Sequence, residues 1–205
     1  ADGWSGTLPE VPQIRPVHPI QAWVDRKLYI HNLGHAATAY LGDLYAPELR
    51  YIAEVINEES VYHEARTAME TTGLALRYEY PGVFSEADVT GHIEDLLYRF
   101  GSRTLGDTVF RVGRDIRRKL SADDRIAGAL HLLRRHEVST DPLERVYRAA
   151  LRFRGRDEAG NLFPEDERFH QELESHPDPR EFNADLSGFD PKEDQPLIDR
   201  LLGNK

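Results

Sequence analysis

The 205-residue sequence contains no cysteine, and this absence excludes several kinds of chemistry. Disulfide bonds, zinc–thiolate centres and thiol nucleophiles all require a cysteine side chain. The chain also lacks a run of about 20 apolar residues, the length that a membrane-spanning helix needs. Its first residues have neither the basic start nor the apolar stretch of a secretory signal peptide. These absences lead us to expect a cytoplasmic protein.

The sequence also lacks the common fingerprints of nucleotide binding and hydrolysis. It contains no G-x-G-x-x-G motif, no P-loop, no GxS-type nucleophile elbow and no HExxH motif. The formal net charge of −10 argues against nucleic acid as a partner, because binding a phosphate backbone needs a basic surface. A few arginines can still form a local site for a small anion on an acidic protein.

The composition is that of a folded globular protein, with 40% apolar and 30% charged residues. Apolar residues recur at helical spacing along most of the chain, and almost no period-two alternation indicates strands. The sequence therefore predicts an all-α fold. Helices are expected over residues 18–41, 47–57, 60–76, 85–100, 121–136, 142–153, 165–175 and 192–202.

Boundary residues place the ends of several of these helices. Ser85 and Asp88 form a capping-box pattern, and Ser121 followed by two aspartates indicates another helix start. Gly42 is expected to end the first helix, and Gly73 to interrupt or end the third.

Residues 1–17 are predicted to be a linker and residues 18–205 a helical domain. The chain begins without methionine, and its first twenty residues contain four prolines, so we expect it to be part of a longer protein. Further along, residues 154–161 are predicted to form a charged loop, and residues 176–194, rich in proline and aspartate, a loosely built segment.

The stretch RKLYIHNLGH concentrates polar side chains on an otherwise amphipathic helix. Lys27, His31 and His35 follow one another at four-residue spacing, and Asn32 and His35 are three apart. Lys27, Asn32 and His35 can therefore converge on one pocket, especially if Gly34 lets the helix bend or a ligand approach the backbone. This set offers a base, an amide donor for an alkoxide and an imidazole with a tunable pKa.

Spacing alone leaves other interpretations of this stretch open. The same residues can form the solvated face of an ordinary helix, with His31 and His35 paired to nearby carboxylates. A metal site on these two histidines would need a third ligand, and none stands nearby in the sequence, so no metal is expected.

Lys27, Asn32 and His35 match the motif of a known family, in which four residues separate the lysine from the asparagine and two more precede the histidine. Through this motif and the continuation GHAATAYLG, the chain resembles the polyol-specific long-chain dehydrogenases, the mannitol dehydrogenase family. A second block, RVGRDIRRKLSADDR, is similar to the same family. Both blocks look most like its mannitol-1-phosphate branch, and the resemblance covers roughly residues 10–155.

The resemblance implies an enzyme of two domains. An N-terminal Rossmann domain binds NAD or NADP, and a helical C-terminal domain supplies the catalytic residues. This chain resembles the second domain alone, so the Rossmann domain is its expected partner outside the chain. The implied reaction is hydride transfer between a nicotinamide and a sugar-alcohol carbon, most closely the interconversion of mannitol 1-phosphate and fructose 6-phosphate. A free hexitol or a uronate as substrate remains an alternative, as does a non-catalytic helical module for dimerisation or sugar-phosphate binding.

The resemblance also implies roles for the motif residues. Lys27 is the general base for the alcohol proton, Asn32 donates a hydrogen bond to the developing alkoxide, and His35 orients the substrate hydroxyls. His31 lies outside the motif and is a further candidate for substrate contact.

The second block adds basic residues that can hold a substrate phosphate. Arg111 and Lys119 are the first choices, followed by Arg114 and Arg118, because guanidinium groups bind phosphate through paired hydrogen bonds. The alternative is a basic helix end that only balances an acidic chain.

Overall fold

The computed structural model describes residues 17–203, and most of them are helical. Within this range the chain forms no β-sheet, and one isolated antiparallel bridge joins Tyr51 to Thr108. The all-α prediction is confirmed. None of the helices in this range is long and apolar enough to cross a lipid bilayer. The expected linker falls, apart from residue 17, outside the described residues.

The helices follow one another with short connections. They are α1 (Ile20–Arg26), the π-helix η1 (Lys27–Asn32), α2 (Leu33–Tyr45), α3 (Ile52–Val55), α4 (Glu59–Glu79), α5 (Glu86–Phe100), the 3-10 helix η2 (Arg103–Leu105), α6 (Val109–Gly113), α7 (Ile116–Lys119), α8 (Ala127–Arg135), α9 (Asp141–Arg152), α10 (Pro164–Ser175), α11 (Pro179–Ser187) and α12 (Gln195–Leu202).

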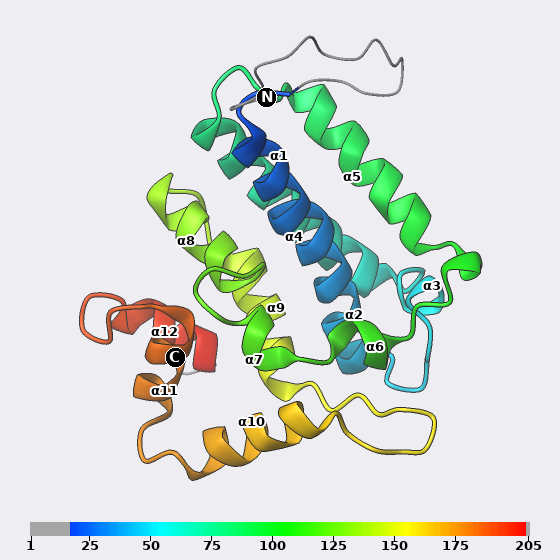
Figure 1. Cartoon of the computed structure of the whole chain (residues 1–205), viewed down its shortest axis with the longest axis vertical. Coiled ribbons are helices and arrows are strands. Elements are labelled where there is room, and N and C mark those ends of the chain that lie inside the picture. Colours follow the sequence, from blue (N-terminus) through cyan, green and yellow to red (C-terminus); the bar gives the residue numbers. More distant parts are fainter. Residues whose placement is uncertain (1–16, 204–205) are drawn as a thin grey trace, which may run out of the picture.

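The first three elements form one continuous helical rod, from Ile20 to Tyr45. Figure 1 shows this rod, in blue, crossing the molecule beside α4, with α5 on one side and α10–α12 on the other. The α2 part of the rod packs against α4, α6 and α9. The rod is therefore the central element around which the other helices are arranged.

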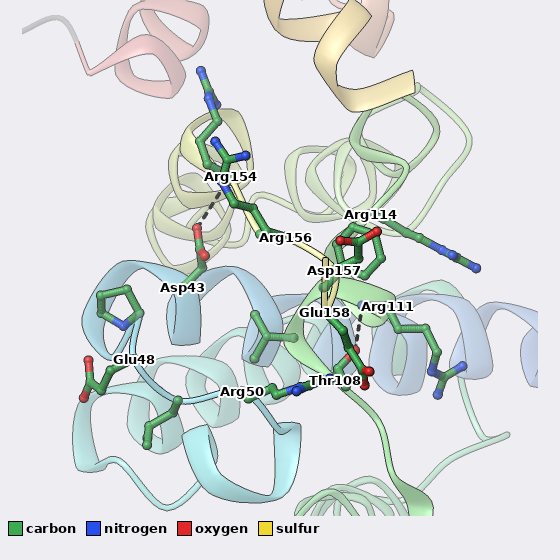
Figure 2. A pocket seen from close by; sticks show the side chains of 15 residues that line it. Asp43, Glu48, Arg50, Thr108, Arg111, Arg114, Arg154, Arg156, Asp157 and Glu158 are labelled. Carbon is green, nitrogen blue, oxygen red and sulfur yellow. Dashed lines mark hydrogen bonds and ion pairs between the residues drawn. The ribbon is translucent and has the colours of Figure 1, made fainter. Parts of the chain in front are cut away.

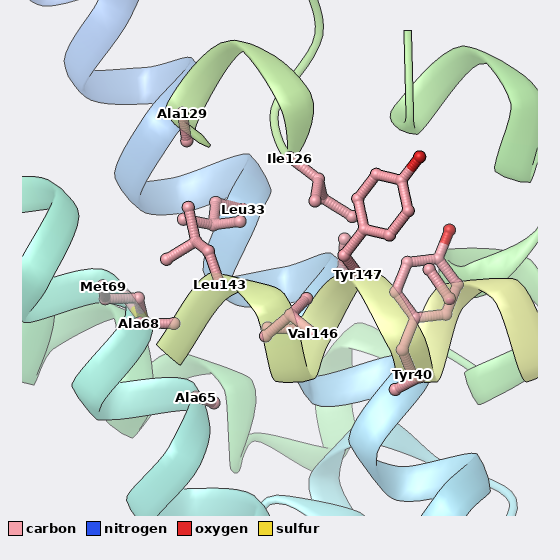
Figure 3. Packing of buried hydrophobic residues seen from close by; sticks show 14 of the residues in the cluster. Leu33, Tyr40, Ala65, Ala68, Met69, Ile126, Ala129, Leu143, Val146 and Tyr147 are labelled. Atoms are coloured by element: carbon pink, nitrogen blue, oxygen red, sulfur yellow. The ribbon is translucent and has the colours of Figure 1, made fainter. Parts of the chain in front are cut away.

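Large side chains from three helices fill the core behind the rod. Leu33 and Tyr40 of α2, Met69 of α4, and Leu143 and Tyr147 of α9 are fully buried, and Figure 3 shows them packed together. Removing an apolar side chain of this size from water stabilises a fold by roughly 1.5–3 kcal/mol. This burial holds one face of the rod in place.

Glycines inside the helices allow close packing and do not end the helices. A Cβ atom on Gly42 would lie 2.9 Å from the Val55 side chain, and one on Gly73 would lie 2.4 Å from Val89. The predicted helix stop at Gly42 and the predicted break or stop at Gly73 are therefore wrong. Each helix continues through its glycine. The residue is glycine because a neighbouring helix approaches too closely for a side chain.

Two other helix predictions are corrected. The expected helix over 47–57 is reduced to Ile52–Val55. The expected start at Ser121 is wrong because the Ser121 hydroxyl donates to the Arg118 carbonyl at 2.7 Å, and α8 begins only at Ala127.

Side-chain caps mark the starts of α5 and α11, among others. Ser85 and Asp88 form the predicted capping box at α5, with hydrogen bonds of 2.9 and 3.1 Å between side chain and backbone. Asp178 accepts the backbone N–H of Arg180 at 2.8 Å and begins α11. This helix lies in the segment 176–194, which was expected to be loosely built. The Asp178–Pro179 pair is a start signal that the sequence offered and the prediction overlooked.

Candidate active site

The motif stretch folds as a π-helix, and this changes which of its side chains share a face. Residues Lys27–Asn32 form η1, and the Leu33 N–H reaches back five residues to the Leu28 carbonyl. In a regular α-helix, residues five apart point in different directions. The wider turn of a π-helix reduces this angular separation. The π-helix therefore brings Lys27 and Asn32 closer to one face of the rod than α-helical geometry would.

Gly34 has a different role from the one expected. A Cβ atom at this position would lie 2.4 Å from the Met69 sulfur, so the missing side chain lets α2 pack directly on α4. Gly34 thus faces the core and leaves no room for a ligand at its Cα. The motif geometry comes instead from the π-helix Lys27–Asn32, which precedes Gly34.

Two motif side chains are without partners in the part of the chain that the structure describes. The Lys27 side chain is exposed and Asn32 is half-buried. Neither makes a side-chain hydrogen bond or an ion pair with any residue from 17 to 203. Both polar groups are consequently available to a ligand.

His35 follows one helical turn after Asn32 and is held between a ring and a carboxylate. Its imidazole stacks on Phe100, with ring centroids 4.9 Å apart and planes inclined by 12°. Its Nε2 atom lies 3.2 Å from Asp107 Oδ2, but their orientation does not form a hydrogen bond, and this buried nitrogen has no partner. The imidazole therefore has a defined orientation and unused hydrogen-bonding capacity.

Burial lowers the pKa of His35 to about 4, and the His31 ring and the nearby cations Arg111, Arg125 and Lys119 act in the same direction. At neutral pH the His35 imidazole is neutral. The same cations form a positive environment around the motif.

Two of the predicted basic residues lie near the motif. Arg111 forms an ion pair with Asp107, the carboxylate next to His35. Lys119 is buried, and its ammonium donates to the carbonyls of Gly113 and Arg114. Burial, together with the neighbouring Arg125 and Arg118, lowers the pKa of Lys119 to about 8. Both cations lower the pKa of His35.

The other two predicted arginines are engaged elsewhere. Arg118 forms ion pairs with Asp115 and Asp124. Arg114 lies over the Phe163 ring, with its guanidinium carbon 5.4 Å from the ring centroid. Neither guanidinium contacts the side chain of Lys27, Asn32 or His35.

His31 faces α5. Its ring centroid is 6.1 Å from that of Phe100, and burial lowers its pKa, assisted by Arg99 and Lys27. Asp95 acts in the opposite direction. Residues 17–203 contain no group of three His, Cys, Asp or Glu side chains placed to hold a metal ion.

Arg125 is a site residue that the sequence analysis did not select. Its side chain is only 17% exposed, and it pairs with Asp124 at 2.7 Å. Its charge lowers the pKa of His31, His35 and Lys119, so it lies close to all three. The available signal was its position at the end of the second sequence block.

A cavity of 710 Å³ lies at the other end of the rod, beside the loop that contains residues 154–158. Arg111 and Arg114 help to line it, but Lys27, Asn32 and His35 do not. Figure 2 shows the two arginines extending away from Arg154 and Arg156, so the four guanidinium groups do not converge. The cavity is therefore separate from the motif.

Comparison with known protein families supports the grouping of the motif with the second block. The family model of the mannitol dehydrogenase C-terminal domain matches residues 19–185. The chain belongs to this family. The match extends beyond residue 155, where the resemblance was expected to fade, and it includes α10 and most of α11.

Individual relatives of this mannitol dehydrogenase domain agree with the family match. The chain is 34% identical over 150 residues to the mannitol-1-phosphate 5-dehydrogenase of Paenarthrobacter aurescens (strain TC1), which covers 73% of the chain and 38% of that protein. The chain thus spans less than half the length of this relative.

Two solved structures share the fold. The mannitol 2-dehydrogenase of Pseudomonas fluorescens, in a ternary complex with NAD and D-mannitol, matches with a TM-score of 0.68 and 22% identity, over 91% of this chain and 39% of that one. A substrate-free D-sorbitol dehydrogenase matches with a TM-score of 0.65 and 17% identity, over 91% and 38% of the two chains.

Proposed function

We propose that this domain supplies the substrate-binding and catalytic groups of an NAD(P)-dependent polyol dehydrogenase that interconverts mannitol 1-phosphate and fructose 6-phosphate. The observation that carries the proposal is the π-helix, which brings the unpartnered side chains of Lys27 and Asn32 closer to one face, one turn before His35. The mannitol-1-phosphate relative supports the choice of substrate.

The charges around His35 also support a phosphorylated substrate. Arg111, Lys119 and Arg125 act on this histidine together, within a chain whose formal net charge is −10. Such a local group of cations favours a dianion over a neutral sugar.

In this proposal, the amine of Lys27 takes the alcohol proton during oxidation and returns it during reduction. The Asn32 amide donates a hydrogen bond to the same oxygen, which carries negative charge as the proton leaves. His35, neutral at physiological pH, binds a neighbouring substrate hydroxyl and fixes the orientation of the sugar.

The cofactor does not fit a site within this domain. Residues 17–203 form no βαβ unit, and the sequence has no glycine-rich dinucleotide motif. A bound nicotinamide supplies reversible acceptance of a hydride. We propose that NAD or NADP is bound mainly by an N-terminal Rossmann domain outside these residues, in a cytoplasmic enzyme.

The test is a rate assay on the complete gene product that contains this domain. NADH and NADPH consumption would be followed with fructose 6-phosphate and with fructose, in the wild type, in Lys27→Ala and in Asn32→Ala. We expect a preference for the phosphate ester. Loss of the base should reduce kcat by roughly 10²–10⁴-fold, and loss of the amide donor by roughly 10²–10³-fold.

Lys192→Ala is the matched control, because Lys192 is an exposed lysine far along the chain, outside the family match. It should retain the wild-type rate. A preference for fructose would contradict the phosphorylated substrate and leave the reaction class intact. Full activity of Lys27→Ala would contradict the catalytic role and favour a non-catalytic sugar-binding module.

A further inference from the structure

Asp107 lies between η2 and α6 and is fixed by its backbone. Its carbonyl accepts the Ile52 N–H at 2.9 Å, and the Val109 N–H donates to the Arg50 carbonyl at 2.9 Å. These bonds flank the bridge between Tyr51 and Thr108. The main chain around Asp107 is thereby tied to the segment before α3 on both sides, and its carboxylate is held in one place.

The Asp107 carboxylate contacts two of the candidate substrate-binding residues. One oxygen lies 3.2 Å from His35 Nε2, and the other forms an ion pair with Arg111. The Asp107 side chain is 12% exposed, whereas Arg111 is 55% exposed. A mostly buried carboxylate thus joins a histidine of α2 to an arginine of α6 whose charged end can reach solvent.

Phe100 completes the enclosure of the imidazole. It is buried and stacks on one face of the His35 ring, while Asp107 lies at the ring's edge. Although the two atoms are not oriented as a hydrogen bond, the negative charge of a carboxylate 3.2 Å from Nε2 favours the tautomer with its proton on that nitrogen. This leaves Nδ1, which makes no hydrogen bond within residues 17–203, to accept one from a substrate hydroxyl.

We propose that Asp107 is a positioning residue, which holds the His35 imidazole in the Nε2–H tautomer and the Arg111 guanidinium beside it in one fixed arrangement towards the substrate. The inference rests on the proposed function, because it requires His35 and Arg111 to touch the substrate. Asp107 itself acts through these two side chains.

The test replaces Asp107 with asparagine, which keeps the shape and removes the charge. Long-range ¹H–¹⁵N spectra of the histidine rings in this chain would report the tautomer of His35 at neutral pH. The wild type should show the Nε2–H form, and Asp107→Asn should show an increased Nδ1–H population. In the complete gene product, kcat/KM for fructose 6-phosphate should fall by an amount on the order of 10²-fold, as expected for misplaced binding groups.

Asp199→Asn is the matched control. Asp199 forms an ion pair with Arg180 between α12 and α11, so the same substitution removes one Asp–Arg pair at a distance from the motif. Neither the His35 tautomer nor kcat/KM should change in this variant. If Asp107→Asn does not remain folded, Asp107→Glu keeps the charge but moves it by one methylene, and the spectra should again show a redistribution of the tautomers.

The outcomes separate this inference from the proposed function. An active wild type with an unchanged His35 spectrum and unchanged kinetics in Asp107→Asn would overturn the role of Asp107 alone. An inactive wild type would contradict the proposed function, and the spectra would still decide whether Asp107 sets the state of His35.

Discussion

Two histidines, His35 of α2 and His92 of α5, are neutral at physiological pH. Burial lowers the pKa of His35 and of His92 to about 4, and nearby cations contribute to both shifts. A neutral imidazole can accept a hydrogen bond as well as donate one, whereas an imidazolium can only donate. His35 therefore keeps a hydrogen-bond acceptor across the whole physiological range.

His92 should make the fold sensitive to acid. Its folded-state pKa of about 4 lies below the 6.5 of an exposed histidine, so the unfolded chain binds the proton first as the pH falls below 6.5. Between pH 7 and pH 5 this linkage lowers the free energy of unfolding by about 2 kcal/mol. His92→Gln should remove that part of the pH dependence, as measured by urea unfolding at the two pH values.

His63→Gln provides the comparison, because His63 lies on the exposed side of α4. This variant should keep the pH dependence of the wild type. An equal loss of stability on acidification in the wild type and in His92→Gln would show that His92 is not responsible.

At the scale of the helices, the packing of α2 on α4 depends on the missing side chain of Gly34. In Gly34→Ala the new methyl group would overlap the Met69 thioether, and overpacking of this kind costs about 1–3 kcal/mol. Gly91→Ala is the matched variant, since Gly91 is exposed inside α5 and a Cβ there has nothing within 4 Å. It should stabilise the protein by roughly 0.5–1 kcal/mol through helix propensity.

Thermal unfolding of the two variants gives the comparison directly. The midpoint should fall for Gly34→Ala and rise for Gly91→Ala. Adding Met69→Ala to Gly34→Ala should remove the overlap, so the double variant should be more stable than the sum of its single changes. Strict additivity would contradict the contact.

Most of the longer helices could be predicted from the sequence, but α6, α7 and α11 were not, and the ends of several others were misplaced. Periodicity identified α4, α5, α9, α10 and α12, and the Ser85 capping box was confirmed because a cap depends only on neighbouring residues. Gly42 and Gly73 misled the prediction because their meaning depends on a partner helix distant in sequence.

In the candidate site, too, local sequence identified the residues, but features that depend on distant packing were missed. Lys27, Asn32 and His35 were selected through a sequence motif, but the π-helix that brings the first two closer to one face was not expected, since tertiary packing can impose such a turn on a helical sequence. Arg125 was missed because its approach to His31, His35 and Lys119 depends on how the chain turns between α7 and α8.

At the scale of the whole molecule, buried polar contacts attach the C-terminal helices to α9. The Tyr147 hydroxyl bonds Asn183 at 3.0 Å and Ser187 at 2.8 Å, and Ser187 in turn donates to the Leu120 carbonyl at 2.8 Å. The buried Glu144 accepts from Arg200 of α12 at 3.0 Å. The segment from α11 to α12 is thereby part of the same folded unit as the rod.

Tyr147→Phe should loosen this attachment. The change leaves the buried Asn183 Oδ1 without its partner, and such a loss costs about 1–3 kcal/mol. The free energy of unfolding should fall by this amount, and limited proteolysis should cut the C-terminal segment sooner. Tyr98→Phe is the control, because Tyr98 is 84% exposed and should change neither quantity. Equal stability of the two variants would contradict the structural role of the Tyr147 hydroxyl.

Met69 is the only methionine in this sequence. It packs against Gly34, which lies in the sequence between the motif residues Asn32 and His35. A ¹³C-methyl label introduced through methionine would therefore give the isolated domain a single resonance, already assigned by its uniqueness. Because that methyl group lies directly behind the motif, its chemical shift would report whether a ligand occupies the opposite face of the rod. The contact that fixes the helix packing thus provides the domain with its own spectroscopic probe of binding.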